Sequence, residues 1–308
     1  MTTHLYHHAI CLEHVNSPGH PERPDRLRAI EAALSDPHFD ALIRIEAPEA
    51  DVDSFSLAHP GAHVKRIASL IPTEGLARID ADTSACPQTW NAVKRAVGAA
   101  LAGVDDVFTG KADNVFASVR PPGHHAEKTM AMGFCLINSI AVAARYAQKQ
   151  YGAERVAIVD FDVHHGNGTQ DIFYDDPTVL FASSHQMPLY PGSGALNETG
   201  TGNIFNAPLR NGDDGSAFKE AFRNRILPAV DNFAPDLILI SAGFDAHRLD
   251  PLAGLNLEAE DFDWATGKLM ELSTKHCDNR LVSLLEGGYD LQGLAESTAA
   301  HVNRLMTG

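Results

Sequence analysis

The chain has 308 residues with 24 Lys and Arg against 40 Asp and Glu, and its formal charge at pH 7 is -16. This acidic excess argues against nucleic acid as a partner, because sequence-independent binding to phosphates needs basic residues. No apolar run is long enough to span a bilayer, and the N-terminus has no basic region followed by a long apolar stretch. We therefore expect a cytoplasmic protein without a membrane partner.

The four cysteines are far apart in the sequence and contain no CxxC pair, so the sequence indicates neither a zinc knuckle nor a disulfide framework. We expect them to be reduced. No linker rich in Ser, Gly or Pro divides the chain, so we predict one domain over residues 1–308. A homo-oligomer is compatible with this sequence.

Apolar runs rich in Val, Ile and Leu alternate with segments of helical spacing, a pattern that predicts a parallel sheet covered by helices on both faces. In chain order we predict a helix over residues 24–34, a helix over 89–102, a strand ending in RPPGHH, a helix over 139–151, a strand ending in DFDVHH, a long functional loop from His185 to Leu209, a helix over 217–232, a strand ending in SAGFDAH, a helix over 259–276, a strand ending in LEGGYD and a helix over 291–305.

Metal-ligating residues follow two of these strands. Asp162 and His164 are two apart on an extended segment, so their side chains point the same way, and Asp245 ends another strand. One imidazole and two carboxylates leave an open position on a four-coordinate ion, which is typical of catalytic zinc, although Fe²⁺ or Co²⁺ would accept the same ligands. Gly166 and His247 stand where further carboxylates would be needed for a second metal, so we predict one ion.

Groups that move protons follow the same strands. His124 and His125 come after two prolines and a glycine, and we interpret them as bases near the metal, the alternative being an exposed polar pair. Asp160 is placed to accept a hydrogen bond from an imidazole or to hold a monovalent ion, and both roles are compatible. The Tyr289 hydroxyl could donate to an oxyanion, the alternative being a core tyrosine.

The motifs HPERPDRL, RPPGHHA, GFC, DFDVHHGNGTQ, SAGFDAH, DPL and LEGGYDL closely resemble the zinc-dependent histone deacetylase family, especially its class II branch and bacterial relatives. The resemblance runs from about His20 to Leu291. It implies the arginase/deacetylase fold, in which a mostly parallel sheet of about eight strands is flanked by helices, and the hydrolysis of acyl-lysine amides. By position it makes Asp162, His164 and Asp245 the zinc ligands.

In such enzymes the second histidine of the pair, here His125, acts as general base and then acid, and His124 is paired with Asp160. Tyr289 matches the tyrosine that polarises the scissile carbonyl. Asn167 stands where class I members have Asp, so the resemblance predicts a neutral partner for His125. The alternative is a regulatory protein that keeps the pocket but does not turn over substrate. Loss of Tyr289 or of either central histidine would have favoured it, and none of them is lost.

The family's acyl-lysine tunnel maps onto Gly133, Phe134 and Tyr190, and Asp82 matches a rim aspartate more loosely. Class II members that hydrolyse acetylpolyamines carry Glu after the DP motif, whereas Leu252 stands there in this chain. An apolar gate favours acyl-lysine on a peptide, with an acetylpolyamine or another small acylated amine as the alternative.

The resemblance also implies structural potassium. It predicts one site formed by Asp160 with Asp162, His164, Ser183 and Ser184, and a second site that involves Phe173, Asp176 and Val179.

Overall fold

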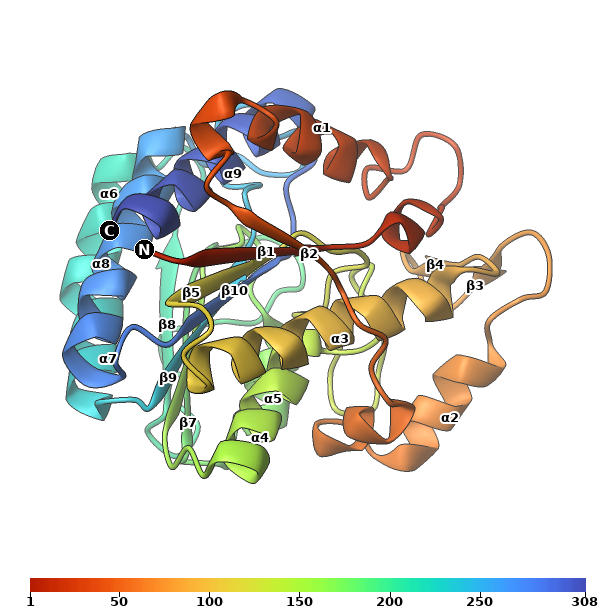
Figure 1. Ribbon diagram of the computed structural model, residues 1–308, viewed down its shortest axis with the longest axis horizontal. Coiled ribbons are helices and arrows are strands. Elements are labelled where there is room, and N and C mark those ends of the chain that lie inside the picture. The colour runs from red at the N-terminus through yellow and green to blue at the C-terminus, as the bar shows by residue number, and fades with distance from the viewer.

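Eight parallel strands form the central sheet of the computed structural model, which describes residues 1–308 (Figure 1). This confirms the predicted α/β class and the sheet that the resemblance implied. In spatial order the strands are β2 (Ile43–Glu46), β1 (Thr3–His7), β5 (Asn114–Ala117), β10 (Leu281–Leu285), β9 (Leu237–Ala242), β6 (Val156–Asp160), β7 (Val179–Gln186) and β8 (Ile204–Leu209). A short antiparallel pair, β3 (Ala77–Arg78) and β4 (Ser84–Ala85), lies outside it.

The four strands that the sequence predicted are the four in the middle of the sheet. All residues of β5, β6, β9 and β10 are buried, because helices cover both faces. Their register is level: Ala117 pairs with Leu284, Leu284 with Ser241, and Ser241 with Asp160. The segments that follow these strands therefore begin side by side at one edge of the sheet.

Helices cover both faces of the sheet (Figure 1). One face is covered by α3 (Thr89–Phe108) and α4 (Ser139–Tyr151), which pack on each other, and the opposite face by α1 (Asp25–Leu34), α8 (Ala259–His276) and α9 (Leu291–Thr307). The remaining helices are α2 (Gly61–Ser69), α5 (Asn167–Phe173), α6 (Gly215–Ala221) and α7 (Leu227–Phe233). A π-helical turn, Phe222–Ile226, joins α6 to α7, so the helix predicted over 217–232 is present with one irregular turn.

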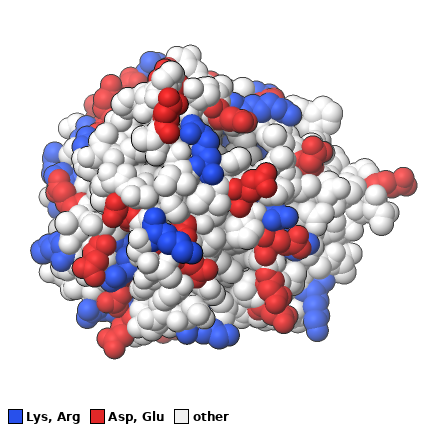
Figure 2. Space-filling view, viewed as in Figure 1, with Lys and Arg blue, Asp and Glu red and all other residues white.

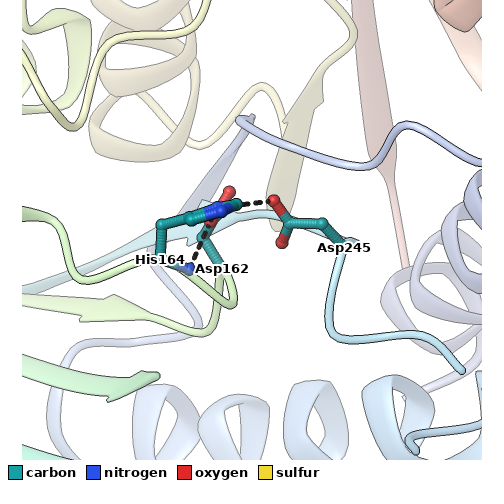
Figure 3. A group of neighbouring side chains, drawn as sticks. All are labelled: Asp162, His164 and Asp245. Atoms are coloured by element: carbon teal, nitrogen blue, oxygen red, sulfur yellow. Dashed lines mark hydrogen bonds and ion pairs between the residues drawn. The ribbon is translucent and has the colours of Figure 1, made fainter. Parts of the chain in front are cut away.

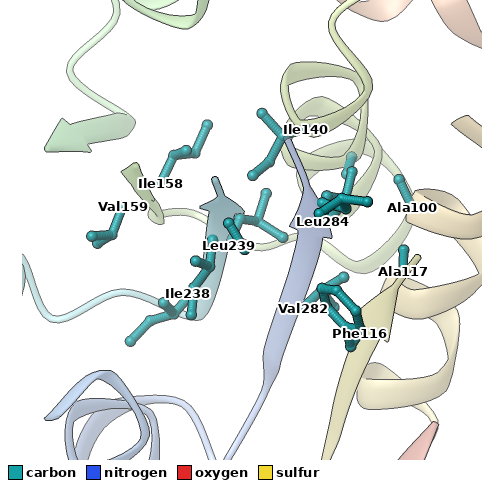
Figure 4. Packing of buried hydrophobic residues seen from close by; sticks show 14 of the residues in the cluster. Ala100, Phe116, Ala117, Ile140, Ile158, Val159, Ile238, Leu239, Val282 and Leu284 are labelled. Carbon is teal, nitrogen blue, oxygen red and sulfur yellow. The ribbon is translucent and has the colours of Figure 1, made fainter. Parts of the chain in front are cut away.

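Most of the buried apolar side chains form one cluster of 76 residues. Figure 4 shows part of it, where Ala100 and Ile140 from the covering helices lie near Ala117 and Leu284 of the sheet. Because this cluster is continuous across the sheet, we propose that residues 1–308 form one domain.

The predicted loop from His185 to Leu209 is wrong at both ends. β7 continues to Gln186, and residues Ile204–Leu209 form β8, the edge strand of the sheet. This strand was missed because its burial is incomplete and it contains Pro208, which only an edge strand tolerates well. The loop itself is shorter and spans residues 187–203. The strands β1, β2 and β7 and the helices α2 and α5 were not predicted individually either.

Acidic and basic side chains are interspersed on the face of the molecule in Figure 2. The charge on this face is therefore mixed and not divided into separate patches of one sign. None of the helices combines the length and the apolar character needed to cross a membrane.

We predict that Gly98→Ala destabilises the fold. A Cβ atom at Gly98, inside α3, would meet the backbone of Pro48, which cannot move aside as a side chain end could. We expect a cost of about 1–3 kcal/mol, seen as a lower midpoint of thermal unfolding. Gly61→Ala in α2 is the control, because its new Cβ would meet only Ser56 Oγ at 3.8 Å. Equal midpoints for the two variants would contradict the close approach.

Candidate active site

Asp162, His164 and Asp245 come together at the carboxyl edge of the sheet, after β6 and β9 (Figure 3). His164 Nδ1 lies 3.1 Å from Asp162 Oδ1 and 3.1 Å from Asp245 Oδ2. Three ligand atoms around one zinc ion would lie about 3.3 Å apart in a tetrahedral site. The prediction that these three side chains meet is therefore confirmed, and their spacing suits a single small cation.

The charge of this group also fits a cation. Both carboxylates are fully buried, and they share one imidazole nitrogen without contact to a Lys or Arg side chain. Burial and the neighbouring Asp162 raise the pKa of Asp245. Burial alone would lower the pKa of His164, but the two carboxylates outweigh it and raise this pKa to about 10. A buried anion pair of this kind needs a positive partner, which a divalent ion bound to neutral His164 would supply.

Backbone donors fix the orientation of both carboxylates. Gly287 N–H donates to Asp162 Oδ2 at 2.8 Å, and Val163 N–H donates to Asp245 Oδ1 at 2.8 Å. Gly287 leaves room for this contact, since a Cβ there would collide with Asp245 Oδ2. Each carboxylate therefore presents its other oxygen to His164.

The two adjacent histidines lie beside the metal group and have different partners. His124 Nδ1 is 2.9 Å from Asp160 Oδ2, and His125 Nδ1 is 2.7 Å from Asn167 Oδ1, the two pairings that the resemblance implied. Burial lowers the pKa of His125 far below its usual value, and the nearby His124 and His164 lower it further. Burial opposes the protonation of His124, but Asp162 and Asp160 raise its pKa well above the usual value.

Tyr289 is held by its backbone and by its ring. Its N–H donates to Asp250 Oδ2 at 2.7 Å, and the Arg26 guanidinium lies 4.9 Å from the ring centroid. Arg26 also donates through Nε to Gly288 O at 2.6 Å. Burial raises the pKa of Tyr289 well above 10.0, so the hydroxyl keeps its proton. The turn that carries Tyr289 is fixed on both sides.

A pocket of about 230 Å³ opens above these groups. His125, His164 and Tyr289 line its inner part together with all five residues predicted to contact a substrate: Asp82, Gly133, Phe134, Tyr190 and Leu252. Asp82 lies in the bend between β3 and β4 and is partly buried. Leu189 also lines the pocket and was not predicted, although its place next to Tyr190 in MPLYPG was a signal.

Gly133 and Phe134 form a turn with left-handed backbone, at φ 57° and 68°. A Cβ at Gly133 would collide with the His125 ring, so only glycine fits this wall of the pocket. Two residues of the β3–β4 hairpin hold the turn: Gly133 N–H donates to Asp82 Oδ1 at 3.1 Å, and Phe134 N–H donates to Thr83 Oγ1 at 2.9 Å.

Two buried charged residues that support the site were missed by sequence reasoning. Glu286 Oε2 accepts from Gly123 N–H at 2.7 Å and from His124 N–H at 3.1 Å. Glu22 accepts hydrogen bonds from both Arg26 and Arg120 and has no exposed surface. Glu286 directly precedes the GGY motif, and Glu22 lies in the HPERP motif, so their positions were visible but their partners were not.

Comparison with known proteins places this site in a family. Residues 20–305 match the model of the histone deacetylase domain. The chain is 41% identical over 305 residues to the protein named histone deacetylase 10, chloroplastic, of Oryza sativa subsp. japonica, which covers 92% of this chain and 69% of that protein. It is 37% identical over 277 residues to the histone deacetylase-like amidohydrolase of Pseudomonas aeruginosa, with 88% and 73% covered.

The fold comparison agrees with the sequence comparison. The crystal structure of the HDA15 HD domain matches with a TM-score of 0.93 at 37% sequence identity, and the match covers 99% of this chain and 89% of that one. At this identity the likeness extends beyond the shared fold to the sequence itself.

We predict that the purified protein holds one zinc ion per chain and that Asp245→Asn greatly reduces zinc binding. The substitution removes one of the two charges that a cation must balance, while the amide keeps the size of the side chain. Metal analysis of the dialysed protein measures this, with Asp36→Asn, far along the chain and exposed, as the control. A full zinc equivalent in Asp245→Asn would contradict the ligand set.

Proposed function

Because the chain belongs to the histone deacetylase family and is a hydrolytic deacetylase, we propose that it removes acetyl or other short acyl groups from lysine side chains of peptides. The observation that carries this proposal is the pocket, whose apolar walls lead to His125 and Tyr289 beside the metal group. An apolar slot of this form suits the methylene chain of an acylated lysine.

Zinc dependence is characteristic of the family, and the ion supplies a Lewis acid that lowers the pKa of water and polarises a carbonyl. We assign it to Asp162, His164 and Asp245; Fe²⁺ and Co²⁺ remain alternatives for the same ligands.

We propose that His125 accepts the proton of the attacking water and later gives it to the lysine nitrogen. Asn167 Nδ2 donates to Glu127 Oε1 at 2.8 Å, which turns Asn167 Oδ1 toward His125. His125 Nδ1 therefore carries the hydrogen of that contact, and Nε2 is left free to accept a proton. His124, paired with Asp160, contributes positive charge beside it.

Tyr289 is proposed to donate its hydroxyl hydrogen to the oxygen of the acyl carbonyl as negative charge develops there. Its raised pKa keeps the hydroxyl protonated, and its fixed backbone reduces the cost of placing it. Gly133 is proposed to accept the substrate amide N–H through its carbonyl, and Asp82 to contact the substrate backbone at the rim.

We also propose structural potassium beside the site, held by Asp160 with Asp162, His164, Ser183 and Ser184. Asp160 and Ser183 are registered neighbours on β6 and β7, and both are fully buried. Oxygen-rich, buried positions suit such an ion.

The cytoplasmic location stays a prediction from the sequence.

The substrate is tested on chelated protein titrated with zinc, by following product release from acetyl-lysine peptides and from acetylputrescine. We expect faster turnover of the peptides. A preference for acetylputrescine would favour the alternative, a small-amide hydrolase.

We predict that His125→Ala and Tyr289→Phe each lower kcat on an acetyl-lysine peptide by roughly two or more orders of magnitude. One variant removes the proposed base and the other only a hydroxyl, so the unfolding midpoint should change little. His7→Ala and Tyr174→Phe, at exposed positions, are matched controls. Full peptide hydrolysis by Tyr289→Phe would refute the role given to its hydroxyl.

Leu252→Glu is predicted to shift preference toward acetylpolyamines, because a carboxylate at the pocket wall would attract the distal ammonium of such a substrate. The ratio of kcat/KM for acetylputrescine to that for the peptide measures the shift. Leu76→Glu, at a side chain 46% exposed and outside the pocket lining, adds the same charge elsewhere. An unchanged ratio in Leu252→Glu would discard the gate argument.

A further inference from the structure

Three backbone carbonyls in the turn between α5 and β7 converge on one side-chain amide. Asn203 Nδ2 lies 2.8 Å from Phe173 O, 3.0 Å from Asp176 O and 2.8 Å from Val179 O. Asn203 is only 4% exposed. An amide group has two hydrogens for these three acceptors, so at least one hydrogen is shared. Convergent carbonyl oxygens are also the arrangement by which proteins replace the hydration shell of a monovalent cation.

The orientation of the Asn203 amide is fixed by its other end. Asn203 Oδ1 accepts from Thr201 N–H at 3.1 Å and from Thr201 Oγ1 at 3.1 Å. Exchanging the oxygen and nitrogen would set the amide oxygen against three carbonyl oxygens and the amide hydrogens against a backbone N–H. The nitrogen therefore belongs at the centre of the three carbonyls.

The carboxylates of the turn are exposed or already paired. Of the two acidic residues in the turn, Asp175 is exposed, and the Asp176 carboxylate is used by Arg145 and by Thr178, whose N–H donates at 2.9 Å. The Arg145 guanidinium also lies 4.8 Å from the centroid of the Phe173 ring. The turn already has a fixed positive charge beside it.

Resemblance to the family implies a second monovalent cation at Phe173, Asp176 and Val179, and these residues do not fit one in this chain. We infer that the Asn203 side chain takes the place of that cation. The turn is then held by a covalently attached donor, whose effect does not depend on the salt in solution. Potassium is then restricted to the proposed position beside Asp160.

The replacement of the cation by Asn203 also affects the wall of the pocket, because Asn203 is the last residue of the loop that carries Tyr190. Asn203 also accepts through its backbone carbonyl from Phe181 N–H at 3.0 Å, so it joins the loop to β7 and to the turn. The end of the rim loop is therefore anchored without an ion.

Asn203→Asp tests the inference, because it sets a carboxylate oxygen of nearly the same shape against the three carbonyls. That group of four oxygens requires a cation. We expect the unfolding midpoint of the variant to be higher in KCl than in tetramethylammonium chloride of equal ionic strength by about 3 °C or more beyond the wild-type difference.

Asn114→Asp is the matched control. Asn114 is 1% exposed, and its Nδ2 donates to a single backbone carbonyl, Leu305 O, at 2.8 Å. Its variant should be destabilised equally in both salts. If Asn203→Asp does not fold, Asn203→Ser serves instead, since it removes the amide and leaves the charge unchanged.

Crystals grown in rubidium chloride give the direct measurement, because the anomalous signal of rubidium locates each monovalent site. We expect no rubidium at the three carbonyls of the wild type and one ion there in the variant, with the position beside Asp160 as an internal reference. A rubidium peak at the three carbonyls of the wild type would overturn the inference. A variant with neither the peak nor the salt-dependent midpoint would overturn it equally.

Discussion

Negative charge buried at one edge of the parallel sheet is the constraint around which the rest is arranged. Asp160 ends β6, Asp162 follows it and Asp245 follows β9, and level register brings all three to the same edge with no exposed surface. Isolated carboxylates are costly in such surroundings. His124, whose pKa is raised, supplies positive charge beside Asp160 and Asp162, and the ion proposed for Asp162, His164 and Asp245 would supply more, so the groups that stabilise the edge are also the groups suited to hydrolysis.

Carboxylates that accept backbone N–H groups hold the loops around this edge. Glu286 fixes the segment before His124, Asp250 fixes the turn at Tyr289, and Asp82 fixes the turn at Gly133. Each contact joins segments far apart in the sequence, so no loop needs to be rigid by itself. Preorganised groups of this kind lower the cost of orienting a substrate and the groups that act on it.

The sequence predicted the part of the site that lies on strands. The four central strands are apolar, and their ends carry unusual polar motifs, so pattern alone indicated where Asp162 and Asp245 would meet. The helix predicted over 259–276 has the same bounds in the structure, because its apolar spacing is regular. Periodicity could not reveal Glu22, whose partner Arg120 is 98 residues away, nor the edge strand β8, whose pattern is broken by Pro208.

Partners from distant segments are also the reason why motifs alone do not reveal whether the turn between α5 and β7 binds a cation. Phe173, Asp176 and Val179 offer only backbone carbonyls, which every sequence possesses, so what fills the space between them is decided by a residue from another segment. That residue is Asn203, which lies at the end of a loop that brings the chain back to the turn between α5 and β7. A neutral donor satisfies the carbonyls without adding charge near Arg145, whereas an ion would need compensation there. Whether such a group of carbonyls binds a cation therefore depends on what lies between the carbonyls, and not on the residues that carry them.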